Sequence, residues 1–287
     1  MDIMKLRPLF TAISLFLILG AILSIVFWGF KPSIDFTGGA IWEINSSKIS
    51  EDNYKEIFSK NQIDLKNINS LGGNNYLLKF NDISLSQKES LNKSLKEIDQ
   101  DFKELKFESL GATLGRELLE KTVFAVVLTS LFLFLFIGRR FRDFSFGTSA
   151  VLAMLHDTLI LMGSFSVLGH YFGAQLDSLF VTAVLTTLSS SVHDTVVTFD
   201  RIRELKKQTY QLDWVKLSNK AVTETLTRSI NNSMTIIIML TSLVLLGGDT
   251  TRWFAAALLI GVVCGTYSSI GVAIPLVIFF KKHSKKK

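Results

Sequence analysis

Long apolar windows dominate the 287-residue chain and limit it to folds that bury them in a lipid bilayer. With 48% hydrophobic residues and only three prolines, the chain has the composition of a membrane protein. The windows cover residues 9–30, 122–137, 144–168, 179–199, 226–246 and 253–280. We therefore expect a polytopic α-helical membrane protein with six transmembrane helices. The first window could be a signal peptide, but about twenty apolar residues exceed the ~7–15 of such a segment.

Basic residues gather in the loops that the positive-inside rule places in the cytoplasm. The net charge is +6, and Lys and Arg concentrate near the amino terminus, at 139–142, over 201–220 and in the tail at 281–287. The loops at 169–178 and 247–251 contain neither residue. We therefore expect both termini in the cytoplasm. These charges follow membrane topology, so no nucleic-acid partner is expected.

The polar stretch at 40–110 predicts a soluble domain between the first two membrane helices. Strands are predicted over 40–45, 65–71, 76–80 and 103–110, and helices over 50–58 and 86–102. The resulting order, βαββαβ, is typical of a ferredoxin-like domain. Ser50 is expected to cap the first of these helices, and Gly72-Gly-Asn-Asn75 predicts a hairpin turn.

These predictions divide the chain into four parts. We expect a cytoplasmic amino terminus with the first membrane helix at 1–30, an extracytoplasmic α+β domain at 31–118, membrane helices two to six at 119–280, and a basic cytoplasmic tail at 281–287.

A turn motif opens the extracytoplasmic domain. Pro32 ends the first helix, and Gly38 and Gly39 permit a tight chain reversal at the outer surface. Asp35, between them, is either a solvated turn carboxylate or a group with a specific contact in the outer domain.

Two His-Asp pairs lie inside apolar windows. His193 and Asp194 come near the end of the fourth window, and His156 and Asp157 come roughly 18 Å into the third, close to mid-bilayer. A carboxylate there costs at least ~2.5 kcal/mol on insertion scales, so by default it marks an ion or proton pathway. The alternative for His156 and Asp157 is packing, in which they satisfy each other or nearby hydroxyl groups.

Polar side chains accompany Asp194 on its own helix and on the next one. The fourth and fifth windows run antiparallel through a cytoplasmic loop, so Asp194 and Arg228 both lie near inner helix ends and can reach each other. Arg228 could instead extend its side chain to the headgroups. The supporting polar stripes comprise Thr187, Ser190 or Ser191, Thr198, Asn231 or Asn232, and Thr235.

Small residues recur at a spacing of four, which places them on one face of a helix. They are Gly111 and Gly115 before the second window, and Ala257, Gly261, Gly265 and Ser269 in the last. In a membrane this spacing is typical of close helix packing. The segment 212–222 mixes apolar residues with Lys and Asn, which predicts an amphipathic helix on the membrane surface.

The chain carries no cluster that would support catalysis. The single cysteine, Cys264, lies inside the last window, which excludes a disulfide within the chain and a thiol metal cluster. The sequence also lacks a recognisable nucleophile arrangement and a phosphate-binding loop. We therefore expect no enzyme activity, no cofactor and no metal.

Four motifs, taken in order, resemble the SecF family of bacterial protein export subunits. They are Ile34-Asp-Phe-Thr-Gly-Gly39, Gly111-x-x-x-Gly115, Leu155-His-Asp157 and Val192-His-Asp-Thr-Val-Val-Thr-Phe-Asp-Arg-Ile-Arg-Glu204. The resemblance covers essentially the whole chain. It departs from the family pattern at His193, where Asn is usual, at Ser33, where Gly is expected, and at Ala112, where Pro is expected. The imidazole of His193 could carry protons, alter Asp194 or face another helix.

The resemblance implies membership of the RND transporter superfamily and an accessory role in the Sec protein translocase. It implies a SecD-like subunit with which the chain uses the proton-motive force to assist export, and contacts with the Sec translocon channel, the translocating polypeptide and the lipid bilayer. It also implies a multi-pass protein of the inner (plasma) membrane, with Asp194 and Arg228 in the proton pathway. The alternatives are a translocase scaffold that moves no protons and a half-size RND-type exporter.

Overall fold

A computed structural model describes residues 2–141, 143–208 and 213–284 of the chain. The chain divides into two compact units, Met1–Lys31 with Phe124–Lys287, here called the helical unit, and Pro32–Val123, here called the sheet unit. The end of the predicted basic tail, 285–287, lies outside the described residues, as does the start of the predicted surface helix at 212.

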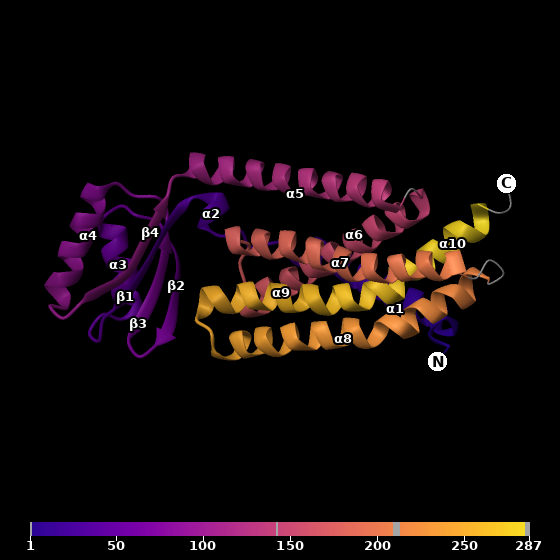
Figure 1. Ribbon diagram of the computed structural model, residues 1–287. Helices are drawn as coiled ribbons and strands as arrows, with labels where there is room; N and C mark the ends of the chain where they lie inside the picture. Colours follow the sequence, from indigo (N-terminus) through magenta and orange to yellow (C-terminus); the bar gives the residue numbers. More distant parts are fainter. Residues whose placement is uncertain (1, 142, 209–212, 285–287) are drawn as a thin grey trace. The chain divides into compact units, whose positions relative to one another are not determined.

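The helical unit consists of long helices joined by short turns (Figure 1). The elements, which include a 3₁₀ turn η1 and a π-helical turn η2, are η1 (Ile3–Leu6), α1 (Arg7–Trp28), α5 (Ala112–Phe141), α6 (Phe144–Phe172), α7 (Ser178–Gln208), α8 (Trp214–Leu246), α9 (Asp249–Ser268), η2 (Ser269–Ala273) and α10 (Ile274–Ser284). Helix α5 begins in the sheet unit and continues into the helical unit. The core of the unit is formed by α6, α7 and α9, which contact one another.

Five helical segments of the described chain are long and apolar enough to cross a membrane. They are Ile3–Trp28, Thr113–Phe141, Phe144–Phe172, Trp214–Leu246 and Thr251–His283. Helix α7 has 31 residues but is not among them, so the predicted count of six is not confirmed. The reason is composition, because α7 carries hydroxyl groups and charges that its neighbours α6, α8 and α9 partly cover.

Helix α8 is continuous from Trp214, so the separate surface helix predicted at 212–222 is wrong. The stretch 214–246 contains neither Gly nor Pro, so nothing in it breaks the helix. Trp214, Leu217 and Ala221 are buried in the core of the helical unit instead of facing a membrane surface.

The last predicted span changes its helical pitch partway along. Helix α9 continues into the π-helical turn η2 and then into α10. Pro275 follows Gly271 by four residues and has no N–H to donate to the Gly271 carbonyl, so the α-helical ladder is interrupted at that point. The wider turn at η2 accommodates this interruption.

The sheet unit has the predicted element order. Its elements are α2 (Ile34–Thr37), β1 (Gly39–Asn45), α3 (Glu51–Lys60), β2 (Leu65–Gly72), β3 (Asn75–Phe80), α4 (Leu85–Ile98) and β4 (Lys103–Leu110). The strands form one antiparallel sheet in the order β2-β3-β1-β4, with α3 and α4 on the same face (Figure 1). Between them Trp42 is fully buried with Tyr54, Phe58 and Leu91.

Local signals placed these elements correctly. Ser50 accepts a hydrogen bond from the Asn53 N–H and caps α3, as predicted. The turn between β2 and β3 has positive φ at Gly73 (60°) and Asn74 (66°), the conformation of a type I′ hairpin turn.

The turn motif and Gly115 meet inside the sheet unit. Gly38 (φ 69°) and Gly39 (φ 126°) reverse the chain after α2, and a β-carbon at Gly39 would lie 2.8 Å from the Phe80 carbonyl oxygen. A β-carbon at Gly115 would lie 2.8 Å from the Gly38 nitrogen. Gly115 therefore allows α5 to approach this turn, and its close contact is not with a membrane helix. Asp35 is half-buried in the same motif.

Candidate functional site

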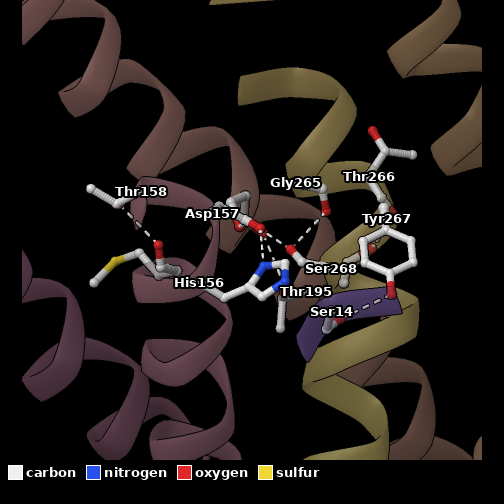
Figure 2. A network of polar contacts seen from close by, with 12 residues as sticks. Ser14, His156, Asp157, Thr158, Thr195, Gly265, Thr266, Tyr267 and Ser268 are labelled. Carbon is white, nitrogen blue, oxygen red and sulfur yellow. Dashed lines mark hydrogen bonds and ion pairs between the residues drawn. The ribbon is translucent and has the colours of Figure 1, made fainter. Parts of the chain in front are cut away.

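Asp157 of α6 is a fully buried carboxylate held by three side chains (Figure 2). Its Oδ1 lies 3.0 Å from His156 Nδ1. Its Oδ2 accepts hydrogen bonds from Ser191 Oγ of α7 and Ser268 Oγ of α9, both at 2.6 Å. We call His156, Asp157, Ser191 and Ser268 the Asp157 site, and it joins three helices through one carboxylate.

Close packing of α9 on α7 brings these hydroxyl groups together. A β-carbon at Gly261 would lie 2.2 Å from Thr187 Oγ1, and one at Gly265 would lie 3.2 Å from Ser191 Cβ. Only glycine allows the two backbones to approach this closely. The predicted packing seam of the last span is therefore confirmed, and its function is to place Ser191 and Ser268 on the same carboxylate.

His156 has one engaged and one open ring nitrogen. The side chain is buried, with 5% of its surface exposed, and its Nε2 has no hydrogen-bond partner among the described residues. Beside an ionised Asp157, Nδ1 carries the hydrogen and Nε2 keeps its lone pair. The site therefore contains a buried imidazole nitrogen with unused acceptor capacity beside a carboxylate.

Asp194 of α7 has a different environment. The residue is half-buried, and its Oδ2 accepts a hydrogen bond from Ser229 Oγ of α8 at 3.1 Å. His193 is exposed. One turn further along α7, Thr198 Oγ1 lies 3.3 Å from Thr225 Oγ1 of α8.

The predicted pairing of Asp194 with Arg228 is absent from this structure. No ion pair between described residues joins the two, and Arg228 is exposed on α8. The group that meets Asp194 is the next residue, Ser229. Adjacent helical residues point about 100° apart, so when Ser229 faces α7, Arg228 faces away from it.

The remaining predicted polar residues divide between an inner and an outer surface. Thr187, Ser191 and Thr198 are buried on α7, and the half-buried Ser190 donates a hydrogen bond to the Thr187 carbonyl. On α8, four predicted residues are exposed and together form what we call the α8 polar face: Arg228, Asn231, Asn232 and Thr235.

Sequence reasoning missed the buried hydroxyl groups of α8 and α9. Thr225, Ser229 and Ser233 hydrogen-bond to Thr198, Asp194 and Thr266, respectively. Their fourfold spacing places them on one face and was a readable signal. For Ser268 the sequence offered only a position directly before the seam residue Ser269. The described residues contain no group of three His, Cys, Asp or Glu that could hold a metal ion.

The comparisons with known proteins agree over nearly the whole chain. The family model described as protein export membrane protein SecD/SecF, C-terminal, matches residues 90–283. The protein translocase subunit SecF of Thermobaculum terrenum is 37% identical over 286 residues, which cover 94% of this chain and 90% of that protein. SecF of Anaerolinea thermophila is 35% identical, with coverages of 98% and 94%.

A solved structure has the same fold. The crystal structure of SecDF from Thermus thermophilus, a translocon-associated membrane protein, superposes with a TM-score of 0.85 at 30% identity. The match covers 98% of this chain but 39% of the SecDF chain, so this chain corresponds to one part of the longer protein. Both the sequence and the fold show that the chain belongs to the SecD/SecF family of multi-pass membrane proteins, as a SecF-type protein translocase subunit.

Proposed function

We propose that this chain is the accessory subunit of the Sec translocase that converts proton binding into helix movement and so uses the proton-motive force to assist export. The observation that carries the proposal is that both membrane carboxylates accept hydrogen bonds from other helices. Asp157 accepts from α7 and α9, and Asp194 accepts from α8. A protonated carboxyl group becomes a donor and loses acceptor capacity, so binding a proton changes which helices are held together.

The size of this effect is sufficient for a switch. A hydrogen bond contributes about 0.5–1.5 kcal/mol net, and more when a charged group takes part. Two such bonds at Asp157 and one at Asp194 would change the ratio of two helix arrangements by tenfold or more. Asp157 with His156 is the buried proton site in this proposal, and Asp194 with His193 is the more accessible one.

Arg228 has a conditional role in the same proposal. It precedes Ser229, the partner of Asp194, by one position on α8, so a rotation of α8 by about 100° would exchange Ser229 for Arg228 as that partner. On α7, Thr187, Ser190 and Ser191 precede Asp194; Thr187 and Ser191 are buried, Ser190 is half-buried, and Ser191 binds Asp157.

The α8 polar face supports a SecD-like partner. Amide and guanidinium groups facing lipid cost free energy, so polar residues of a membrane helix normally face protein. In Thermus thermophilus SecDF, this chain's counterpart is part of a longer chain. A separate SecD-like subunit would cover the α8 polar face here, and the translocon channel and the emerging polypeptide would be further partners.

The proposed topology has six spans in the inner membrane, the five candidate segments together with α7, and it places both termini in the cytoplasm. Helix α7 can be more polar than the other spans because α6, α8 and α9 pack around it. The sheet unit would then be an extracytoplasmic domain of ferredoxin-like type. Cysteine labelling from outside, in a Cys264→Ala background, should modify a probe at Asn74 and spare one at Lys282. The reverse labelling would exclude this topology.

The function is tested by export assays in reconstituted vesicles with and without a proton gradient, normalised to the amount of complex. Asp194→Asn should abolish stimulation by the gradient and leave complex abundance unchanged, because Asn is nearly isosteric but cannot bind and release a proton. Arg228→Leu should also lose the stimulation of export by the gradient, because Asp194 then has no cation with which to pair.

The double variant separates proton coupling from a purely structural role as a translocase scaffold. A scaffold is the second candidate function, because the hydrogen bonds that hold Asp157 would also serve to fix the helices together. If Asp194 and Arg228 formed only a structural pair, replacing both could restore abundance and activity together. Gradient-dependent stimulation at the normal level in Asp194→Asn, Arg228→Leu would therefore end the proton-coupling proposal.

A further inference from the structure

Tyr267 and Ser268 are adjacent on α9, and their side chains bind different parts of the helical unit (Figure 2). Ser268 Oγ donates to Asp157. The Tyr267 hydroxyl donates to the Phe10 carbonyl of α1 at 2.7 Å and lies 2.9 Å from Ser14 Oγ, also on α1. The end of α9 therefore connects the Asp157 site to α1 through two consecutive residues.

The ring of Tyr267 is confined on three sides. It lies 6.3 Å from the His156 ring at a tilt of 36°, and 6.3 Å from the Phe10 ring in an edge-on arrangement. A β-carbon at Gly271 of η2 would lie 2.9 Å from the ring. Because α6, α1 and η2 all contact the ring, a shift of η2 or His156 displaces Tyr267 as well.

Helix α1 is joined to α6 by a second set of contacts nearer its carboxyl end. Ser24 Oγ donates to the Gly163 carbonyl at 2.9 Å, and Ser166 Oγ donates to the Ser24 carbonyl at 2.8 Å. Of the hydrogen bonds between described residues, those that join α1 to α9 both end on the Tyr267 hydroxyl. This hydroxyl is thus the polar link between α1 and α9 among the described residues, whereas α6 is joined to α9 by the bond from Ser268 to Asp157.

We propose that Tyr267 is the positioning residue through which the Asp157 site acts on α1. When Asp157 or His156 binds a proton, Ser268 changes its hydrogen bond, and the neighbouring Tyr267 passes the change to α1 through Phe10 and Ser14. Helix α1 leads within three residues, through Lys31, into Pro32 and the sheet unit. This inference rests on the proposed function, because it needs a proton to bind at the Asp157 site.

Few other ionisable groups face the pair from the elements packed around it. On α9 these are Tyr267 itself and the half-buried Cys264. The described residues of η2 include no charged side chain, and in α1 the charge nearest the site in sequence is Arg7 at the helix start. On α7, Asp194 lies three residues beyond Ser191. A pH response that depends on Asp157 can therefore be assigned by testing this short set.

The test uses the assembled complex in vesicles and compares Tyr267→Phe with Tyr171→Phe. The first variant keeps the ring and removes only the hydroxyl bond to α1. The second removes an exposed hydroxyl from a ring that contacts Trp28 of α1, so it controls for loss of a tyrosine hydroxyl next to α1. Ser14→Ala is a graded third variant, because the bond from Tyr267 to the Phe10 carbonyl remains.

Three quantities are measured for each variant: proton uptake that Asp157→Asn abolishes, gradient-dependent export, and the distance between spin labels at Phe16 on α1 and Ile238 on α8, with Cys264 replaced by Ala. Both label positions are exposed. Tyr267→Phe should retain the proton uptake and complex abundance, lose the pH-dependent change in distance, and lose roughly fivefold or more of the gradient stimulation. Ser14→Ala should lose less, and Tyr171→Phe should match the unmodified complex.

The outcomes separate this inference from the function on which it rests. If the unmodified complex shows no Asp157-dependent proton uptake, the Asp157 site is not a proton site and both fail. If that uptake is present and Tyr267→Phe still shows the normal distance change and export, the role of Tyr267 is wrong and the proposed function stands. If Tyr267→Phe lowers the abundance of the complex, the test uses Ser14→Ala instead. A pH-dependent change in distance in Ser14→Ala equal to that of the unmodified complex would then overturn the inference.

Discussion

Asp157 and Asp194 each follow a histidine inside a helix of the same unit, yet their surroundings differ. Asp157 is 1% exposed and holds three side chains from α6, α7 and α9. Asp194 is half-buried and holds one hydroxyl group from α8. The difference shows that the same dipeptide can be a fixed junction or a loosely held group, depending on how its helix is rotated against its neighbours. A junction should resist substitution for reasons of stability, and a loosely held group should tolerate it and lose only function.

Truncation of the two carboxylates should show the difference between the sites most strongly, as a difference in lost stability. Asp157→Ala leaves the Ser191 and Ser268 hydroxyls and the His156 ring N–H without their buried acceptor, at about 1–3 kcal/mol for each group. Asp194→Ala leaves one hydroxyl group, that of Ser229, without its acceptor and should lower the free energy of unfolding by about 1 kcal/mol or less. Thermal unfolding of the purified complex in detergent should rank Asp157→Ala far below Asp194→Ala. Equal losses of stability would show that the two sites do not differ as described.

Enlarging the glycines of the α7–α9 contact should have the next largest effect. Gly261→Leu places atoms where Thr187 lies and should destabilise the helical unit by about 1–3 kcal/mol or more, because overpacking forces the backbones apart. Gly138, where a β-carbon would meet nothing, is the matched control for the same change. Size-exclusion recovery of the complex measures both, and equal recovery would contradict the close contact.

Removing single hydroxyl groups sharpens the comparison at smaller energies. Ser268→Ala leaves a buried carboxylate with one donor fewer and should cost roughly 1.5–3 kcal/mol, the range for hydrogen bonds to charged groups. Ser229→Ala acts on the half-buried Asp194, where water can replace the lost donor, and should cost less. The difference between the two unfolding free energies is the measurement, and a larger loss at Ser229 would reverse our ranking.

Asp99 provides a third buried carboxylate, in the sheet unit, and the mildest test. Its Oδ2 accepts from Ser46 Oγ at 2.6 Å, and this hydrogen bond lowers the pKa of Asp99 below its usual value although burial opposes the shift. A folded-state pKa below the unfolded one stabilises the fold fully above the unfolded value, ~3.9, and that stability is lost as the pH falls through the folded value.

The effect is seen by denaturing, between pH 6 and pH 2, a variant in which Trp42 is the single tryptophan. Asp99→Asn should remove part of the acid-dependent loss of stability in the sheet unit. An unchanged pH profile would show that Asp99 titrates alike in both states.

Local chemistry made the sheet unit predictable, whereas helix rotation made the site hard to predict. The Ser50 cap and the turn at Gly73 and Asn74 depend on residues within a few positions of one another, so their spacing identifies them. The partners of Asp157 come from 34 and 111 positions away. Periodicity finds the polar face of each helix but not which neighbour it meets, and one position separated the expected Arg228 from the observed Ser229.

The same reasoning explains one prediction that is not confirmed, the span at α7, and one that is wrong, the surface helix at 212–222. The window at 179–199 suggested a span because of its apolar residues, but the hydroxyl groups, His193 and Asp194 within the same window lower its mean hydropathy. The amphipathic pattern at 212–222 was read as a surface helix, although the apolar side that it predicts packs against the protein core.

The polarity of α7 has a consequence for biosynthesis. While the chain is being made, the hydroxyl groups and carboxylate that the finished unit covers would face hydrocarbon if α7 entered the bilayer by itself. Helix α6 also carries a carboxylate, but α6 is apolar enough to be a candidate span, whereas α7 is not among the candidates. We therefore expect α7 to remain at the membrane surface or in the insertion machinery until α8 and α9 emerge, and to integrate together with them. A nascent chain stopped after residue 208 should leave α7 extractable by alkali, and one extended through α9 should not.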